Sequence, residues 1–114
     1  MTRKPVVPRQ AANRDVEEII DYYLAEGASR AAADFVTEFQ RALDRIAAHP
    51  AIGSPRYALE LRIPRLRSWP LRRFPYLVFY VEQDAYLEVW RVLHGQRDVP
   101  AWMRSTLQGW DSEL

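Results

Sequence analysis

The sequence predicts one α+β domain, in which an antiparallel hairpin of two helices packs on an antiparallel sheet of three or four strands. Two observations carry this prediction. Residues 76–81 and 86–94 are aromatic and β-branched almost throughout and are separated by a short polar break, as in a central β-hairpin. Residues 12–48 contain two amphipathic helical patterns joined by a short connection. We also expect an N-terminal strand and a short C-terminal helix or tail.

The chain begins with an extended segment and a first helix. Residues 4–9 can form a short strand, which its two prolines restrict to a sheet edge. Apolar side chains then recur at helical spacing over residues 12–26. Asn13 or Asp15 could cap the start of this helix. Gly27 stands where helices commonly end in the left-handed conformation, so the helix is predicted to end there.

The second helix has the most regular apolar spacing in the chain. It is expected to start at a cap formed by Ser29 and to end before Pro50. Residues 49–57 hold two prolines and a glycine and are predicted to form a loop. Alternating apolar side chains permit a half-buried strand over residues 59–63, but Pro64 and Pro70 break the run 59–73 into pieces, and we place the strand of this region around residues 66–69.

The segment after Asp98 has the features of a short terminal helix. Pro100 lies near its possible start, and the apolar side chains from Trp102 to Trp110 share one face. If this helix packs on the sheet, these side chains are structural. If it projects, they form an apolar patch suited to a partner. The sequence leaves both interpretations open.

Length and composition indicate an ordinary globular chain. The 114 residues are expected to form one domain over residues 1–114, and 48% of them are hydrophobic. We expect no membrane span and no secretory signal, and therefore a cytoplasmic location, because no apolar run approaches the required length. The absence of cysteine and the presence of only two histidines argue against a metal site, and no cofactor is expected.

The net charge of +1 conceals an uneven distribution. Residues 61–81 contain five arginines and no acid, whereas residues 82–114 contain six acids and three arginines. The basic segment could meet an acidic protein or nucleic acid, or could be a solvated strand face. We favour a protein partner and leave direct binding to nucleic acid open.

Several stretches, in this order, are typical of a known family. They are Asp15–Ile19 with Tyr22 and Tyr23, the apolar positions of the second helix, HPAIGSP at 49–55, FPYLVFYV at 74–81 and WRVLHGQRD at 90–98. Together with the predicted order of strand, two helices and three strands, they resemble the ParE/RelE superfamily of bacterial type II toxins, also described as plasmid-stabilisation proteins. The last stretch is more similar to the ParE branch than to the RelE branch.

This resemblance implies a toxin that is neutralised by an antitoxin encoded beside it. In the ParE branch the toxin inhibits DNA gyrase by stoichiometric binding, so no catalytic residues are expected, and a ParD-like antitoxin forms a hetero-oligomer with it. We expect the target to be bound by Arg65, Arg72, Arg73, Arg91, His94, Arg97 and Trp102. We expect the antitoxin to be bound by Tyr22, Tyr23, Phe35, Phe39 and Trp69.

Two alternatives remain at the level of sequence. A RelE-like, ribosome-dependent endoribonuclease would use His94, Arg73 and Glu60 as its site, because metal-free RNA cleavage needs a base, an acid and a cation. The single lysine of the chain, and Gly95 where a tyrosine would follow His94, weaken this interpretation. His94 could instead be hydrogen-bonded to the loop that follows it. A non-toxic remnant that only binds the antitoxin is the other alternative.

Overall fold

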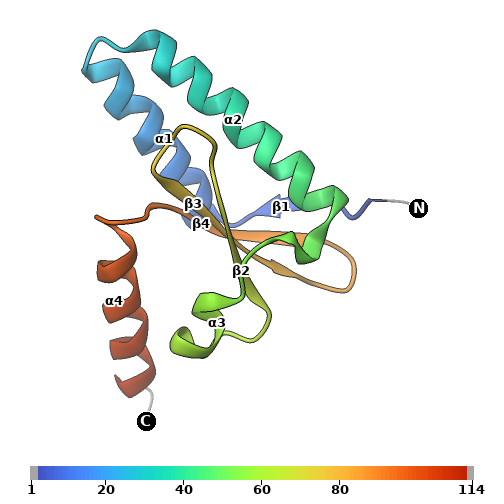
Figure 1. Cartoon of the computed structure of the whole chain (residues 1–114). Coiled ribbons are helices and arrows are strands. Elements are labelled where there is room, and N and C mark those ends of the chain that lie inside the picture. Colours follow the sequence, from blue (N-terminus) through green and yellow to red (C-terminus); the bar gives the residue numbers. More distant parts are fainter. Residues whose placement is uncertain (1–2, 113–114) are drawn as a thin grey trace.

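A computed structural model of the chain describes the backbone of residues 3–112 and the side chains of residues 3–106 (Figure 1). The elements in chain order are β1 (Val6–Pro8), α1 (Gln10–Ala25), α2 (Ser29–Ala48), the 3-10 helix η1 (Pro50–Ile52), α3 (Arg56–Leu61), β2 (Leu66–Pro70), β3 (Tyr76–Glu82), β4 (Leu87–His94) and α4 (Val99–Ser112). The four strands form one sheet in the order β1-β4-β3-β2. The predicted α+β architecture is confirmed.

The predicted hairpin of β3 and β4 is central. Its register runs from Tyr76 opposite His94 to Glu82 opposite Leu87, and β2 pairs antiparallel with the other side of β3. The prediction of an all-antiparallel sheet is wrong for β1, which lies parallel to β4 with Val6 opposite Leu87. This orientation follows from the path of the chain, which leaves β1 through both long helices and β2 before it returns to β4 beside β1.

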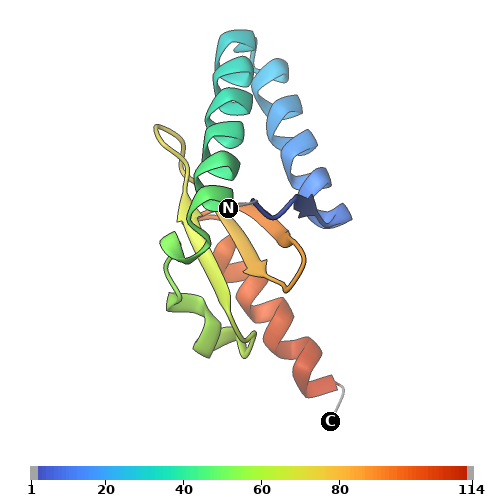
Figure 2. The same ribbon diagram turned by 90° about the vertical axis from the view of Figure 1, so that its right-hand side faces the viewer.

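One face of the sheet is covered by α1 and α2, which lie side by side as an antiparallel pair (Figure 2). Helical spacing puts Ala12 and Ile19 of α1 on the face that meets β4. Phe35 and Ile46 of α2 are fully buried in the same apolar cluster. Burial of this stripe on the sheet, rather than local propensity, stabilises both helices.

The opposite face of the sheet carries α3 and α4. The strand predicted around residues 66–69 is confirmed as β2. The strand that the alternation of residues 59–63 permitted does not form, because Tyr57, Ala58 and Leu61 use helical spacing to reach a second apolar cluster. The start of the terminal helix packs on this face, where Val99, Trp102 and Met103 join the second apolar cluster, and the Trp102 ring lies 4.8 Å from the ring of Phe79. Leu107 and Trp110, which were predicted on the same face of α4, have side chains outside the described residues.

A bulge in β4 adjusts which side chains face which layer. Phe79 pairs with Arg91 and Tyr80 pairs with Val89, so Trp90 is the extra residue. Because of this insertion, Val89 and Val92 both reach the layer of α1 and α2, although they are three positions apart. Arg91, opposite Phe79, nevertheless reaches the carboxylate of Asp15 on α1, as described below.

The helix ends correct two predictions and confirm one. The residues at the N-caps are Arg9 and Ala28, and neither helix has a side-chain cap, so the caps predicted at Asn13, Asp15 and Ser29 are wrong. Asp15 is turned instead toward β4. The predicted left-handed residue after α1 is confirmed, since Gly27 has a φ of +72°.

Candidate functional site

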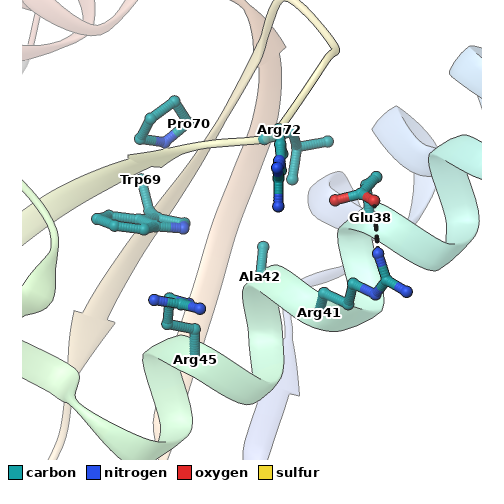
Figure 3. Close-up of a pocket in the computed structure, with 8 residues that line it drawn as sticks. Glu38, Arg41, Ala42, Arg45, Trp69, Pro70 and Arg72 are labelled. Atoms are coloured by element: carbon teal, nitrogen blue, oxygen red, sulfur yellow. Dashed lines mark hydrogen bonds and ion pairs between the residues drawn. The ribbon is translucent and has the colours of Figure 1, made fainter.

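A surface cleft lies between α2 and the end of β2 (Figure 3). This cleft has a volume of about 410 Å³. Its lining comes from one side of α2 and from the last residues of β2 and the turn after it: Glu38, Arg41, Ala42, Arg45, Trp69, Pro70, Leu71 and Arg72. We call it the Trp69 cleft.

Two arginines of the Trp69 cleft have free guanidinium groups. Glu38 is nearly buried and accepts a hydrogen bond of 3.0 Å from Arg41, which neutralises that pair. Among the described residues, Arg45 and Arg72 take part in no ion pair. Half-buried Trp69 offers an apolar surface beside them (Figure 3). The cleft can therefore bind a chain segment that combines an apolar side chain with a carboxylate, or another anion of similar size.

Arg91, which was predicted to bind the target, forms a partly buried ion pair within the fold. Arg91 donates hydrogen bonds of 2.8 Å from both Nε and Nη2 to the two carboxylate oxygens of Asp15. Asp15 is buried and also accepts the backbone N–H of Val92 at 2.9 Å. The hydrogen bonds from Asp15 raise the pKa of Arg91 against the opposing effect of burial. This group joins α1 to β4.

The end of β4 is organised by His94 and Asp98. The Nδ1 atom of His94 accepts the backbone N–H groups of Gln96 at 3.2 Å and Arg97 at 3.0 Å, so the interpretation of His94 as bound to the following loop is confirmed. Asp98 accepts the backbone N–H of His94 at 3.1 Å and the Nε–H of Arg97 at 3.1 Å. These bonds fix the turn between β4 and α4.

This turn is expected to make stability sensitive to acid. Burial alone would raise the pKa of Asp98, but hydrogen bonds from Arg97 and the His94 N–H outweigh it and lower the pKa. A lowered pKa in the folded state stabilises the fold above the ordinary carboxyl pKa, and this stabilisation is lost as the pH falls through the folded-state value.

We therefore expect Asp98→Asn to lose less unfolding free energy than the wild type between about pH 5 and about pH 3. Urea unfolding at both pH values measures the difference. Glu88 also has a lowered pKa, because hydrogen bonds from Arg9 and Trp90 outweigh its burial. It titrates in both proteins, so the difference between them isolates Asp98. If the wild type and Asp98→Asn lose the same unfolding free energy between these pH values, Asp98 is not the group that makes stability sensitive to acid.

The residues proposed for an endoribonuclease site do not lie together. His94 and Arg73 are near the same end of the sheet, since Gly95 donates to the carbonyl of Pro75 at 2.9 Å in the turn that contains Arg73. Glu60 belongs to α3, beyond the other end of β2 (Figure 1). The five residues of β2 span about 17 Å, which separates this carboxylate from the other two groups.

The aromatic residues predicted to bind an antitoxin differ in exposure. Phe35 is fully buried, and its ring contacts those of Tyr23 and Phe39 in the layer between α2 and the sheet. Burial, followed by the neighbouring hydroxyl of Tyr76, raises the pKa of Tyr23 to about 12. In contrast, 51% of Tyr22 is exposed. Tyr22 is thus the exposed member of the predicted set, and Tyr23, Phe39 and Trp69 are half-buried.

Sequence reasoning missed two acids that position this surface. Asp15 shares a helical face with Ala12 and Ile19, and Glu38 shares one with Phe35 and Ala42. A carboxylate at a core-facing position needs a partner, because burying an unpaired charge is costly. The spacing was therefore a usable signal for both acids, although it could not identify the partner.

Two features, a metal-binding cluster and a membrane-spanning helix, are absent from the described part of the chain. No group of three or more His, Cys, Asp or Glu side chains is arranged to hold a metal ion there. None of the helices described is long and apolar enough to cross a membrane.

Comparison with known proteins identifies the family. A family model described as the ParE toxin of the type II toxin–antitoxin system parDE matches residues 6–99. The chain belongs to the ParE toxin family. The match extends from β1 to the first residue of α4, so the family segment of this ParE chain includes the helical hairpin and all four strands.

A solved structure supports the fold of this ParE-family chain. A chain described as part of the chromosomal ParDE toxin–antitoxin system from P. aeruginosa has a TM-score of 0.67 and 17% sequence identity. The alignment covers 81% of the present chain and 96% of the solved chain. No curated protein sequence matches significantly.

Proposed function

We propose that this chain inhibits bacterial growth by interfering with DNA gyrase and that a cognate ParD-like antitoxin neutralises it by forming a hetero-oligomer. The observation that carries the proposal is the family match over residues 6–99. A toxin of this type acts in the cytoplasm, where its target is found. Inhibition is stoichiometric, and it depends on a complementary surface rather than on a set of catalytic groups.

The distribution of functional side chains supports a binding role over catalysis. His94 already accepts two backbone hydrogen bonds, and Glu60 lies at the other end of β2. A general acid and a general base must both reach the reacting ribose and phosphate within hydrogen-bond distance. This separation favours the gyrase inhibitor over a RelE-like endoribonuclease.

The antitoxin is proposed to bind the Trp69 cleft and the exposed side of α1 at Tyr22. An extended or helical segment that carries both acidic and apolar side chains fits the cleft, because Arg45 and Arg72 can pair with carboxylates and Trp69 can be covered. Phe35 would support this surface from inside the core, and the half-buried Tyr23 and Phe39 would support it from the layer packed against the core.

The target is proposed to bind the exposed arginines of the predicted set. Arg65, Arg72 and Arg73 are exposed. Arg91, His94 and Arg97 are engaged in the bonds at the end of β4, and Trp102 packs on Phe79. These four residues are therefore proposed to shape the target-binding surface rather than to make its main contacts.

Expression of the chain alone in bacteria tests the proposal. We expect growth arrest with filamentation and damaged chromosomes while protein synthesis continues, and we expect purified chain to block supercoiling by purified gyrase. A His94→Asn variant retains an acceptor for the loop and is expected to be equally toxic. Early arrest of translation together with a harmless variant would favour the endoribonuclease. Normal growth at full expression would favour a non-toxic remnant.

A further inference from the structure

Helix α3 ends in a motif that normally requires glycine. The N–H of Ile63 donates to the carbonyl of Ala58 at 3.0 Å, and the N–H of Arg62 donates to the carbonyl of Leu59 at 3.3 Å. This pair of bonds is the Schellman motif, whose left-handed residue is usually glycine because a Cβ atom is disfavoured there. In α3 that residue is Arg62, with a φ of +56° and a ψ of +38°.

The same chain closes α1 with the same motif and does use glycine. Ala28 donates to the carbonyl of Tyr23 at 2.8 Å, and Gly27 donates to the carbonyl of Leu24 at 3.0 Å. Gly27 has a φ of +72°. The two helix ends thus have matching backbone hydrogen bonds and differ in the residue that takes the left-handed conformation.

The turn that follows α3 also has an arginine at a position that favours glycine. Leu66 donates its N–H to the carbonyl of Ile63 at 3.2 Å, which closes a four-residue turn. Pro64 is the second residue of this turn, and Arg65 is the third with a φ of +66°. A proline followed by a residue of positive φ is the pattern of a type II turn, which favours glycine or asparagine at the third position.

Neither arginine has a visible role in the fold that offsets the backbone strain. Both side chains are exposed, and among the described residues neither guanidinium takes part in an ion pair. Strained backbone that no packing explains is characteristic of functional surfaces. Arginine at two positions suited to glycine therefore points to a role in binding.

The surroundings of these two arginines indicate the kind of partner. Leu59 is 88% exposed, and Arg56 is exposed near it on α3. From Arg56 to Arg65 the only acid is Glu60. We call Arg56, Leu59, Arg62 and Arg65 the α3 patch. It lies beyond the start of β2, whereas the Trp69 cleft is at the end of that strand (Figure 1).

We infer that the α3 patch contacts an acidic protein surface that covers Leu59 with an apolar side chain. The inference rests on the proposed function, with gyrase as the partner that supplies this surface. A phosphate backbone could pair with the arginines but would leave Leu59 exposed, so the patch fits a protein better than nucleic acid. Its position leaves the Trp69 cleft available to the antitoxin.

Two double variants separate binding from strain. Arg62→Gly/Arg65→Gly removes both side chains and relieves both left-handed positions, whereas Arg62→Ala/Arg65→Ala removes the side chains and keeps the strain. Both are expected to need about tenfold more protein than the wild type, or more, for half-maximal inhibition of supercoiling by purified gyrase. The glycine variant is expected to unfold at the same temperature as the wild type or higher, and above the alanine variant.

Controls make each result decisive. Arg14→Ala/Arg30→Ala removes the same charge from exposed positions on α1 and α2 and is expected to inhibit within about twofold of the wild type. Leu59→Ser is expected to weaken inhibition without lowering the unfolding temperature, because the side chain is already in solvent.

Three results would overturn the inference. If both double variants inhibit gyrase as well as the wild type, the α3 patch is not the contact surface, although the gyrase proposal stands. If the wild type binds a short DNA duplex without gyrase and the double variants lose that binding, the partner is nucleic acid. If the wild type does not inhibit gyrase at all, the proposed function fails and the inference fails with it.

Discussion

Replacing Asp15 with alanine is expected to lower the free energy of unfolding by about 3–5 kcal/mol, as expected when one partner of a buried ion pair is removed. The change leaves the partly buried guanidinium of Arg91 without its carboxylate and the Val92 N–H without an acceptor. Urea unfolding measures the loss. Few substitutions of a single charged residue in a helix should cost as much.

Two further variants identify the cause of that loss. Asp15→Asn keeps an oxygen for the Val92 N–H but loses the charge, so we expect an intermediate effect. Asp21→Ala removes a carboxylate from an exposed position on the same helix and is expected to change stability by less than about 0.5 kcal/mol. A loss below about 1 kcal/mol for Asp15→Ala would show that the pair with Arg91 does not hold α1 to the sheet.

Asp15 also affects how a partner can approach the sheet. β1 pairs only with Leu87–Val89, so the outer edge of β4 is uncovered beyond that point. At this edge, the backbone N–H groups of Val92 and His94 donate hydrogen bonds to the carboxylates of Asp15 and Asp98, respectively. An unpaired edge would otherwise be a template for another strand. Strand addition by a partner at this edge would have to displace both carboxylates.

The other edge of the sheet is protected by the loop before α3. Ser54 exchanges two backbone hydrogen bonds with Ser68 of β2, at 2.8 Å and 3.0 Å, and Pro70 has no N–H to offer. The loop itself is tied down by Tyr80, whose hydroxyl donates to Pro50 and accepts from Gly53. An antitoxin is therefore expected to bind mainly through side chains, as the Trp69 cleft permits.

The elements that the sequence predicted correctly are those with strong local signals. The strands around residues 76–81 and 86–94 are rich in aromatic and β-branched residues, and the helix after Ser29 has apolar side chains at helical spacing over most of its length. Gly27 was predictable for a different reason, because only its lack of a Cβ atom makes the left-handed conformation inexpensive.

The failures occurred where the deciding interaction is distant in sequence. Residues 59–63 alternate as a strand would, but burial of Leu61 against the sheet selects a helix and leaves Leu59 in solvent. A parallel β1 depends on pairing with Leu87, which no local pattern can indicate. The bulge at Trp90 is likewise a property of two paired strands.

The candidate site was harder to predict than the fold because exposure decides it. The arginines of residues 62–73 were identifiable from charge alone. The sequence could not distinguish Arg67, which donates to the carbonyls of Ala51 and Gly53, from Arg72, which takes part in no ion pair with a residue that the structure describes. Similarly, Phe35 and Tyr22 are both aromatic helix residues, and only packing shows that one is core and the other surface.

Replacing Phe79 with alanine is expected to cost about 3–5 kcal/mol of unfolding free energy and to release α4 from the sheet. Phe79 is fully buried, and its ring lies 5.4 Å from that of Tyr57 on α3 and 4.8 Å from that of Trp102 on α4. Because one side chain connects β3 to both short helices, its loss should loosen that whole face. Urea unfolding gives the global effect, and native-state trypsin cleavage after exposed Arg104 reports on α4.

Phe35→Ala is the matched control, because Phe35 is equally buried but belongs to the layer of α1 and α2. It is expected to lower the unfolding free energy by a similar amount without a selective increase in cleavage after Arg104. If cleavage after Arg104 is no faster in Phe79→Ala than in Phe35→Ala, α4 opens only when the whole chain unfolds. If cleavage is selectively faster, α4 opens independently of the rest of the chain, and Phe79 is the side chain that holds it to the sheet.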